Sequence, residues 1–289
     1  MSNAQIIDGN ALSAQIRRQV KESVAALRLA GKPVQLTAVL VGSSPAGQMF
    51  AQRQGQACRD VGIDYQLLSL DAGASAADVA RTLDRLNHDP AVTGIMLHMP
   101  LPPHLDGGAL RQQIQAIKDV EGVTPTNLGL VAYGQPLNAP FTALAAVELV
   151  KSTPLPLRGA EAVVVGASET VGKPAALLLV HERCTVTICR STTRDLAAHT
   201  RRAEILVVAV GKPNFITAEH VRPGAVVIDV GINRITLPDG TKRTVGDVDF
   251  DSVQAKAGYL TPVPGGVGPM TVAILLRNTL QSAKILAGV

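Results

Sequence analysis

The stretch AVVVGASETVGKP, residues 162–174, decides the fold of the C-terminal half of the chain. Residues 162–165 are apolar and predict a buried strand, the small residues after them predict a tight turn, and residues 171–179 predict a helix. Such a turn brings backbone N–H groups and the positive end of a helix dipole together, which suits a pyrophosphate. The glycine spacing differs from the standard dinucleotide fingerprint, so an ordinary strand–helix turn is the alternative. We predict cofactor contacts at Gly166, Ala167 and Ser168.

The next predicted strand, residues 185–189, runs into Arg190, Ser191 and Thr192. In an NAD-binding sheet we expect an acidic residue here, about 20 residues after the glycines, to bind the ribose 2′-hydroxyl. A cation with hydroxyl donors instead suits a 2′-phosphate and favours NADP, although a solvated surface arginine is the alternative. Two further predicted strands, 205–210 and 225–230, end beside glycines, where a nicotinamide can lie against the backbone. These strand ends predict cofactor contacts at Arg190, Ser191, Gly211 and Ile232.

The N-terminal half also alternates strands with helices. Strands are predicted over residues 36–41, 65–70 and 92–99, and helices over 46–61 and 75–87, the latter with Ser75 as its N-cap. This order predicts a parallel open sheet with ligands at the carboxyl ends of its strands. Another helical pattern lies within residues 5–30, residues 125–140 are rich in Gly, Pro and Asn and are predicted to be a linker, and a helix is predicted over 143–151.

The segment TPVPGGVGPMT, residues 261–271, combines prolines and glycines just before an apolar run. Gly adopts backbone angles closed to other residues and Pro fixes φ, so the segment predicts a stiff, bent loop that a ligand can approach closely. An ordinary tight turn is the alternative. The last helix is predicted over 271–287 and is long enough to pack back on the first domain. The predicted domains are therefore 1–140 with the returning helix 272–289, and 141–271.

Composition narrows the class of protein. The 289 residues are 46% hydrophobic and 17% charged and include no Trp, which favours an α/β enzyme whose parallel sheets use small aliphatic side chains. The formal charge of +4 comes without a basic block, so nucleic acid is not an expected partner. No apolar run is long enough to span a bilayer. The three cysteines have neither metal-ligand spacing nor a disulfide framework, which fits a cytoplasmic protein.

Motifs along nearly the whole chain resemble the bifunctional methylenetetrahydrofolate dehydrogenase/methenyltetrahydrofolate cyclohydrolase family. They are IIDG (6–9), VGSSPA (41–46), PLPPH (100–104), KDVEG (118–122), VVVGASETVGKP (163–174), VAVGKP (208–213), VIDVGIN (227–233), GDVDF (246–250) and TPVPGGVGPMT (261–271). The resemblance implies two α/β domains with a cleft between them, folate against the N-terminal domain, NADP on a C-terminal Rossmann domain, and a homodimer. It also implies hydride transfer from 5,10-methylenetetrahydrofolate to NADP, and then hydrolysis of the methenyl cation to 10-formyltetrahydrofolate.

The chain departs from the family pattern at positions expected to face the folate. The family motif S-x-x-Y-V-x-x-K puts a Tyr and the principal catalytic Lys on one helix face, and Phe50 and Gln54 stand at those positions here. His98 replaces a Gln, Glu121 replaces the Asp that grips the pterin, and Thr142 lies in PFTA where the family has PCTP. The resemblance implies catalytic positions at Phe50, Gln54, His98 and Glu121, substrate contacts at Pro100, Leu101, Pro264, Gly265 and Gly266, and a cofactor contact at Thr142.

These departures predict an altered chemistry. Gln54 cannot act as a base near neutral pH, and Phe50 lacks the hydroxyl. Because general acid–base catalysis contributes about 10²–10⁴-fold, we expect a cyclohydrolase that is weakened or absent and a dehydrogenase that relies on alignment. His98 is a candidate replacement base, or a residue that fills space or binds ligand as a neutral donor. The other hypotheses are an enzyme of this fold acting on another one-carbon carrier, and a non-catalytic paralogue that binds NADP or folate.

Overall fold

The computed structural model describes residues 3–42 and 45–289. Ser43 and Ser44, in the middle of the VGSSPA motif, lie outside the described residues. The chain divides into two compact units. The N-terminal unit is Ala14–Phe141 with Val272–Val289, and the C-terminal unit is Thr142–Thr271 with Met1–Ser13. In the part of the chain that the structure describes, no helix is both long and apolar enough to cross a membrane.

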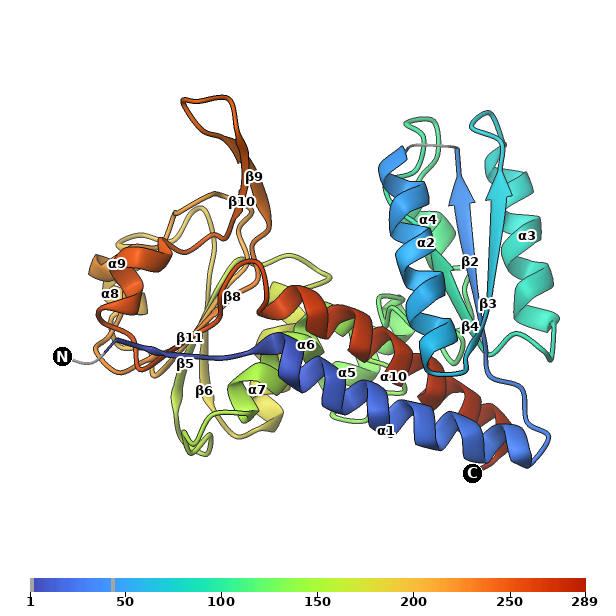
Figure 1. Cartoon of the computed structure of the whole chain (residues 1–289), viewed down its shortest axis with the longest axis horizontal. Helices are drawn as coiled ribbons and strands as arrows, with labels where there is room; N and C mark the ends of the chain where they lie inside the picture. The colour runs from blue at the N-terminus through green and yellow to red at the C-terminus, as the bar shows by residue number, and fades with distance from the viewer. Residues whose placement is uncertain (1–2, 43–44) are drawn as a thin grey trace. The chain divides into compact units, whose positions relative to one another are not determined.

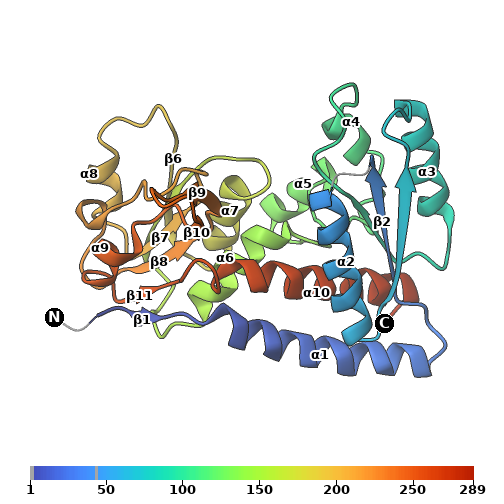
Figure 2. The ribbon, with the colours of Figure 1, turned by 45° about the horizontal axis from the view of Figure 1, so that its top comes forward.

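The N-terminal unit contains a three-stranded parallel sheet in the order β3-β2-β4. The strands are β2 (Gln35–Val41), β3 (Asp64–Leu70) and β4 (Gly94–Leu97), and the helices α2 (Pro45–Asp60) and α3 (Ala76–His88) lie on opposite sides of the sheet (Figure 1, Figure 2). The predicted parallel sheet is confirmed. Its third strand is shorter than predicted, because the chain bends at Met99 and Pro100 soon after His98 donates its N–H to the Val39 carbonyl at 2.9 Å.

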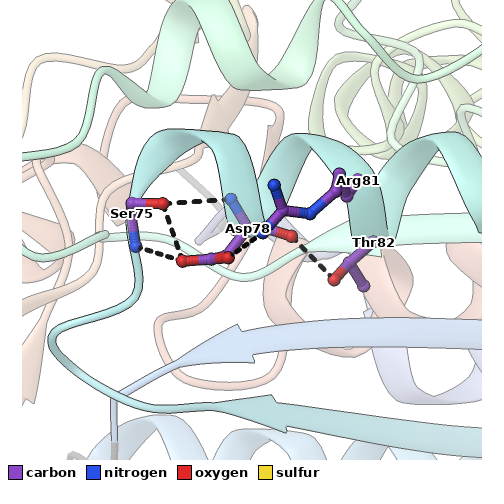
Figure 3. Close-up of polar contacts among 4 residues, drawn as sticks. All are labelled: Ser75, Asp78, Arg81 and Thr82. Atoms are coloured by element: carbon purple, nitrogen blue, oxygen red, sulfur yellow. Dashed lines mark hydrogen bonds and ion pairs between the residues drawn. The ribbon is translucent and has the colours of Figure 1, made fainter.

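Helix α3 begins where the sequence predicts an N-cap. The Ser75 hydroxyl oxygen accepts from the Asp78 N–H, and the Asp78 carboxylate accepts from the Ser75 N–H at 3.0 Å (Figure 3). Arg81 pairs with the Asp78 carboxylate, and the Thr82 hydroxyl donates to the Asp78 carbonyl. This capping box gives partners to N–H groups that the helix itself leaves unbonded. The opposite face of α3 buries Val79, Leu83 and Leu86 in the core of the unit.

The first and last long helices run side by side in both views (Figure 1, Figure 2). They are α1 (Gly9–Leu29) and α10 (Val267–Ala287). A shared buried cluster in the N-terminal unit contains Val20, Val24 and Leu27 from α1 and Leu275, Leu276 and Leu280 from α10. The returning last helix is therefore confirmed. It begins four residues earlier than predicted, since Pro269 fits the first helical turn, where its missing N–H needs no partner.

The predicted linker at residues 125–140 is wrong over its first part. Helix α5 (Pro125–Tyr133) occupies it, with the Thr124 side chain as N-cap, Pro125 in the first turn and Gly134 in the left-handed conformation (φ 76°) at its end. The Pro and Gly that indicated a linker start and stop this helix instead. The short helix α4 (Gly107–Arg111) precedes it, and α6 (Phe141–Lys151) follows it.

The C-terminal unit contains a six-stranded parallel sheet in the order β1-β11-β8-β7-β5-β6. Its strands are β1 (Gln5–Ile6), β5 (Glu161–Val165), β6 (Thr185–Cys189), β7 (Ile205–Val208), β8 (Val226–Asp229) and β11 (Tyr259–Leu260). The other elements are α7 (Gly172–His181), α8 (Leu196–Thr200), a 3₁₀ turn at Ala218–His220, α9 (Phe250–Gln254) and the hairpin of β9 (Asn233–Thr236) and β10 (Lys242–Val245). The central strands are wholly buried, as their unbroken apolar runs predict.

Candidate active site and cofactor site

A cavity of about 570 Å³, which we call the β2–β4 cavity, lies at the carboxyl ends of β2 and β4. In the sheet, β3 lies on one side of β2, and after β3 the chain crosses over so that β4 lies on the other side of β2. The connections therefore diverge between β2 and β4, and an open parallel sheet binds ligands in the crevice at such a point. Residues 40–42 form one wall and His98 with residues 99–102 form another. The cavity is also lined by Gly47, Phe50, Met96, Arg111 and Glu121.

His98 follows β4 directly and is only 4% exposed in this cavity. Its Nε2 has no hydrogen-bond partner among the described residues. The Phe50 ring meets the imidazole edge-on, with the ring centroids 5.6 Å apart. Burial lowers the pKa of His98 below its ordinary value, so the imidazole is neutral at neutral pH. Buried polar atoms in native proteins nearly always have partners, so this nitrogen calls for one from a ligand or water.

Glu121 lines the same cavity and is 6% exposed. Burial raises the pKa of its carboxyl to about 7, with the nearby Arg111 opposing the rise and Asp119 adding to it. An Arg111 Nη2 lies 3.6 Å from a Glu121 Oε1. The Asp119 carboxylate, by contrast, accepts from the N–H groups of Gly122 and Thr124 and holds the loop that carries Glu121. This cavity can therefore present both a carboxyl group and a neutral imidazole to a ligand.

Gln54, expected at the principal catalytic position, is turned into the protein. It is 3% exposed and is not among the described residues that line the β2–β4 cavity. Its amide donates to the Met96 sulfur at 2.8 Å and accepts from the Tyr65 hydroxyl at 3.2 Å. Phe50, one helical turn earlier, is 48% exposed and does line the cavity. The two positions thus differ in their surroundings although they share one face of α2.

A second cavity, of about 490 Å³, lies at the carboxyl ends of β5, β6 and β7. We call it the β5–β7 cavity. Gly166 follows β5 with φ 117°, and a Cβ there would lie 2.1 Å from the Ala209 carbonyl oxygen. A Cβ on Gly172, at the start of α7, would lie 2.0 Å from the Gly166 oxygen. Only glycine fits both places, and the resulting bare turn beside a helix start suits the pyrophosphate of a dinucleotide.

The outer part of the β5–β7 cavity carries positive charge. Arg190 and Ser191 follow β6 and line it, and Lys212 lines it from the segment after β7. The Thr193 hydroxyl accepts from the Arg190 N–H at 2.9 Å and shapes this turn. Arg190 and Lys212 are exposed, so their charged ends are accessible to an anion in the cavity. The residues present therefore fit a dinucleotide that carries an additional phosphate, as NADP does.

Two buried aspartates hold the loops between strands in the C-terminal unit. The Asp247 carboxylate accepts from the N–H groups of Val210, Gly211 and Lys212 at 2.6, 2.9 and 2.9 Å. The Asp229 carboxylate, at the end of β8, accepts from the Asp247 N–H at 2.9 Å. Burial raises the pKa of Asp229 to about 6, while backbone N–H groups oppose the rise. These carboxylates fix the segment after β7, which lines the β5–β7 cavity.

The loop TPVPGGVGPMT lines a third cavity, of about 400 Å³, together with Asn10, Asp229 and Ile232. Pro264, Gly265 and Gly266 all belong to this lining. A Cβ on Gly9 would lie 1.8 Å from the Gly266 carbonyl oxygen, so the IIDG motif and this loop approach as closely as glycine permits. The loop therefore lines a cavity of the C-terminal unit, and its role as a ligand wall stays a prediction.

The predicted site residues fall into three groups. In the N-terminal unit, Phe50, His98, Pro100, Leu101 and Glu121 share the β2–β4 cavity, with Gln54 behind it. In the C-terminal unit, Gly166, Ala167, Arg190 and Ser191 share the β5–β7 cavity, and Ile232, Pro264, Gly265 and Gly266 share the third cavity. Ser168, Gly211 and Thr142 are not among the described residues lining these three cavities. The catalytic and binding roles of all the residues in these groups, and of these three, stay predictions.

Sequence reasoning missed Arg111, Lys212 and Asp247. Lys212 and Asp247 lie in the motifs VAVGKP and GDVDF, but the sequence predicts no site role for either residue. Arg111 lies in a stretch without a motif, and only the fold brings it to Glu121.

Two open parallel sheets, with a glycine turn shaped for a pyrophosphate in one of them, define an α/β protein with a Rossmann-type dinucleotide-binding domain.

The chain belongs to the tetrahydrofolate dehydrogenase/cyclohydrolase family. Residues 7–121 match the catalytic domain of that family, and residues 140–287 match its NAD(P)-binding domain. The predicted family, the two-domain α/β fold and the nicotinamide dinucleotide cofactor are therefore confirmed.

Several relatives match over almost their whole length. The chain is 51% identical to the bifunctional protein FolD of Bordetella avium, covering 97% of this chain and 98% of that one. It is 48% identical to the bifunctional protein FolD of Cupriavidus metallidurans, covering 99% of each. The bifunctional FolD methylenetetrahydrofolate dehydrogenase/cyclohydrolase of Campylobacter jejuni superposes with a TM-score of 0.93 at 39% identity, over 98% of this chain and 99% of that one. The Trypanosoma brucei enzyme, solved with NADP and an inhibitor, has a TM-score of 0.93 at 35% identity and complete coverage of both, 100%.

Proposed function

We propose that this protein is an NADP-dependent 5,10-methylenetetrahydrofolate dehydrogenase of one-carbon metabolism whose methenyltetrahydrofolate cyclohydrolase activity is weakened or absent. Membership of the family supports the dehydrogenase. The loss of hydrolysis is supported by Phe50 and Gln54, which stand where the family has a phenol and an amine. When bound, NADP supplies the hydride acceptor, and the residues of the chain hold the reacting carbon and exclude water.

The observation that carries the proposal is the environment of Gln54. Its amide is bonded on both sides, to the Met96 sulfur and the Tyr65 hydroxyl, and is almost completely buried. A carboxamide neither accepts nor releases a proton near neutral pH. Hydrolysis of the methenyl cation needs water to lose a proton as it attacks, and no proton-accepting side chain stands at this position. Hydride transfer needs alignment instead, so it survives this substitution.

NADP rather than NAD is supported by the β5–β7 cavity. Arg190 and Ser191 line it where β6 ends, about 20 residues after the glycines, which is where a 2′-phosphate lies in dinucleotide-binding sheets, and Lys212 adds a second cation from the segment after β7. The Trypanosoma brucei relative was solved with NADP. We further propose, as the resemblance implies, that the protein is a cytoplasmic homodimer, and that residues 1–140 with 272–289 form the folate domain and residues 141–271 the NADP domain.

A second candidate function is a re-purposed or non-catalytic paralogue that binds NADP or another one-carbon carrier. Two residues of the β2–β4 cavity favour it, because Glu121 and His98 both change the groups presented to a ligand ring. Cofactor binding without tetrahydrofolate binding supports this candidate over the first. Production of NADPH from methylenetetrahydrofolate excludes its non-catalytic form.

The proposal predicts the result of restoring the family residues. The double variant Phe50→Tyr with Gln54→Lys should raise methenyltetrahydrofolate hydrolysis by about 10²–10⁴-fold, the usual contribution of a general acid–base group. Dehydrogenase turnover should change much less. Hydrolysis is followed by the loss of methenyl absorbance, and thermal unfolding is measured in parallel because the new Lys enters a buried position.

A matched control is Gln52→Lys, which adds the same charge on the same helix at an exposed position. It should leave hydrolysis unchanged. Equal hydrolysis by the double variant and the unmodified protein, with both folded, contradicts the proposal that these two positions limit the reaction.

A further inference from the structure

Arg111 ends the short helix α4 and reaches into the β2–β4 cavity. The Asp106 side chain caps the start of α4 by accepting from the Gly108 and Ala109 N–H groups, which fixes the helix. The Arg111 Nη2 lies 3.6 Å from a Glu121 Oε1, and its buried Nε has no hydrogen-bond partner among the described residues. This separation makes an ion pair without a full hydrogen bond, so the carboxylate keeps lone pairs for a ligand.

Among the described charged groups around Glu121, only Arg111 presents a positive charge to it in the cavity. Lys118, three residues earlier, sends its ammonium to the Leu86 and Asp89 carbonyls and not into the cavity. Asp119 faces Glu121 from the same segment but is bonded to backbone N–H groups. His98, across the cavity, is neutral at neutral pH. Of the described residues lining the β2–β4 cavity, Arg111 alone carries a permanent positive charge.

We propose that Arg111 is a positioning residue: it holds a larger share of Glu121 in the carboxylate form at neutral pH, so that Glu121 accepts hydrogen bonds from a substrate ring edge that carries neighbouring N–H donors. The inference rests on the proposed function, because it takes the β2–β4 cavity as the folate site. It adds a residue outside every family motif recognised in the sequence.

The chemistry of a carboxyl group explains why its charge matters. A protonated carboxyl has an O–H donor on one oxygen, so it accepts well from only one of two neighbouring N–H groups. A carboxylate has no donor and accepts from both. Bonds to a carboxylate are also stronger than neutral ones. Burial alone favours the protonated form, and burial raises the pKa of Glu121 to about 7 even with Arg111 present. Without the guanidinium the pKa should rise further and the acid should dominate at neutral pH.

Arg111→Gln tests the inference without substrate. Selectively ¹³C-labelled Glu gives a carboxyl resonance for Glu121, assigned by its loss in Glu121→Gln, whose titration in the ligand-free protein should move up by about one pH unit or more. A one-unit rise from about 7 lowers the ionised fraction at pH 7 about fivefold. The KM for methylenetetrahydrofolate should then rise about fivefold at pH 7 and return close to normal at pH 9, with kcat unchanged. Arg111→Lys, which keeps the charge, should retain most of the normal titration.

The controls separate this inference from the proposed function. Arg111→Met provides a second neutral variant should Arg111→Gln fold poorly, although folding is expected because Glu121 can take up a proton and leave no unpaired charge. Arg81→Gln removes an exposed arginine of α3 and should change nothing. An unchanged Glu121 titration in Arg111→Gln or Arg111→Met overturns the inference. An inactive wild-type protein overturns the proposed function, while the carboxyl titration in the ligand-free protein still decides the role of Arg111.

Discussion

At the scale of single residues, His98 and Gln54 show how two predicted catalytic positions differ in their surroundings. Gln54 has both ends of its amide bonded and contributes no proton chemistry. His98 has a neutral ring at the cavity wall, and its buried Nε2 has no hydrogen-bond partner in the part of the chain that the structure describes. A neutral imidazole can accept a proton, so any residual hydrolysis in this protein should depend on His98.

The hypothesis that His98 serves as a base predicts a pH profile. Because burial lowers its pKa, the base form persists to lower pH than for an ordinary histidine, so the kcat of hydrolysis should be flat near neutrality and fall only as pH drops through that lowered value. His98→Ala should remove both the rate and this acid limb. His104→Ala is the control, because His104 is an exposed histidine at the end of the PLPPH motif that follows His98. Undiminished hydrolysis in His98→Ala leaves His98 as a space-filling residue or neutral donor.

The sequence predicted some site residues and not others for physical reasons. Phe50, His98 and Glu121 stand in motifs, and each lines the β2–β4 cavity. The direction of the Gln54 side chain could not be predicted, because it depends on contacts with Tyr65 in β3 and Met96 in β4. Arg111 could not be predicted either, since its partner is ten residues away across a bend and not on the same helix face.

At the scale of elements, long periodic segments were predicted well and short ones were not. The buried strands and the helices α2, α3, α6 and α7 match their predicted places to within about two residues, because apolar periodicity extends over several turns. The two-residue strands β1 and β11 carry too few residues for a pattern, and the strands of the hairpin β9–β10 are largely polar and lack the apolar run that marks β7 and β8. The error at α5 has a different cause, since Pro and Gly mark helix ends as well as linkers.

The turn after β6 gives a prediction at this scale. Arg190→Ala should weaken NADP binding about tenfold and leave NAD binding nearly unchanged, because a charge-assisted bond to the 2′-phosphate is lost and NAD has no such group. Titration with each dinucleotide measures the two affinities.

Arg194→Ala is the matched control for the turn. Arg194 is exposed in the same turn and is not among the described residues that line the β5–β7 cavity. Equal loss of NADP and NAD affinity in Arg190→Ala would mean that Arg190 supports the fold of the turn. No loss for either dinucleotide would mean that the arginine is only solvated.

At the scale of the whole molecule, the first thirteen residues belong to the C-terminal unit, because β1 adds to the edge of its sheet beside β11. Both long helices, α1 and α10, contain residues of each unit. The functional boundaries at 140/141 and 271/272 and the homodimer stay predictions. Family membership extends along the chain, and the chain covers nearly all of its relatives, so the cofactor and folate functions belong to one polypeptide.

The central proposal is that the residues of the cofactor domain are retained, whereas Phe50 and Gln54 stand in place of the phenol and the amine that serve hydrolysis in the family. The most direct measurement follows both reactions on the same purified, unmodified protein: formation of NADPH from 5,10-methylenetetrahydrofolate, and decay of separately supplied methenyltetrahydrofolate. We predict measurable NADPH formation with accumulation of the methenyl compound, whose enzymatic decay is slower by about 10²-fold or more. Decay of the methenyl compound at a rate that matches NADPH formation would contradict the account.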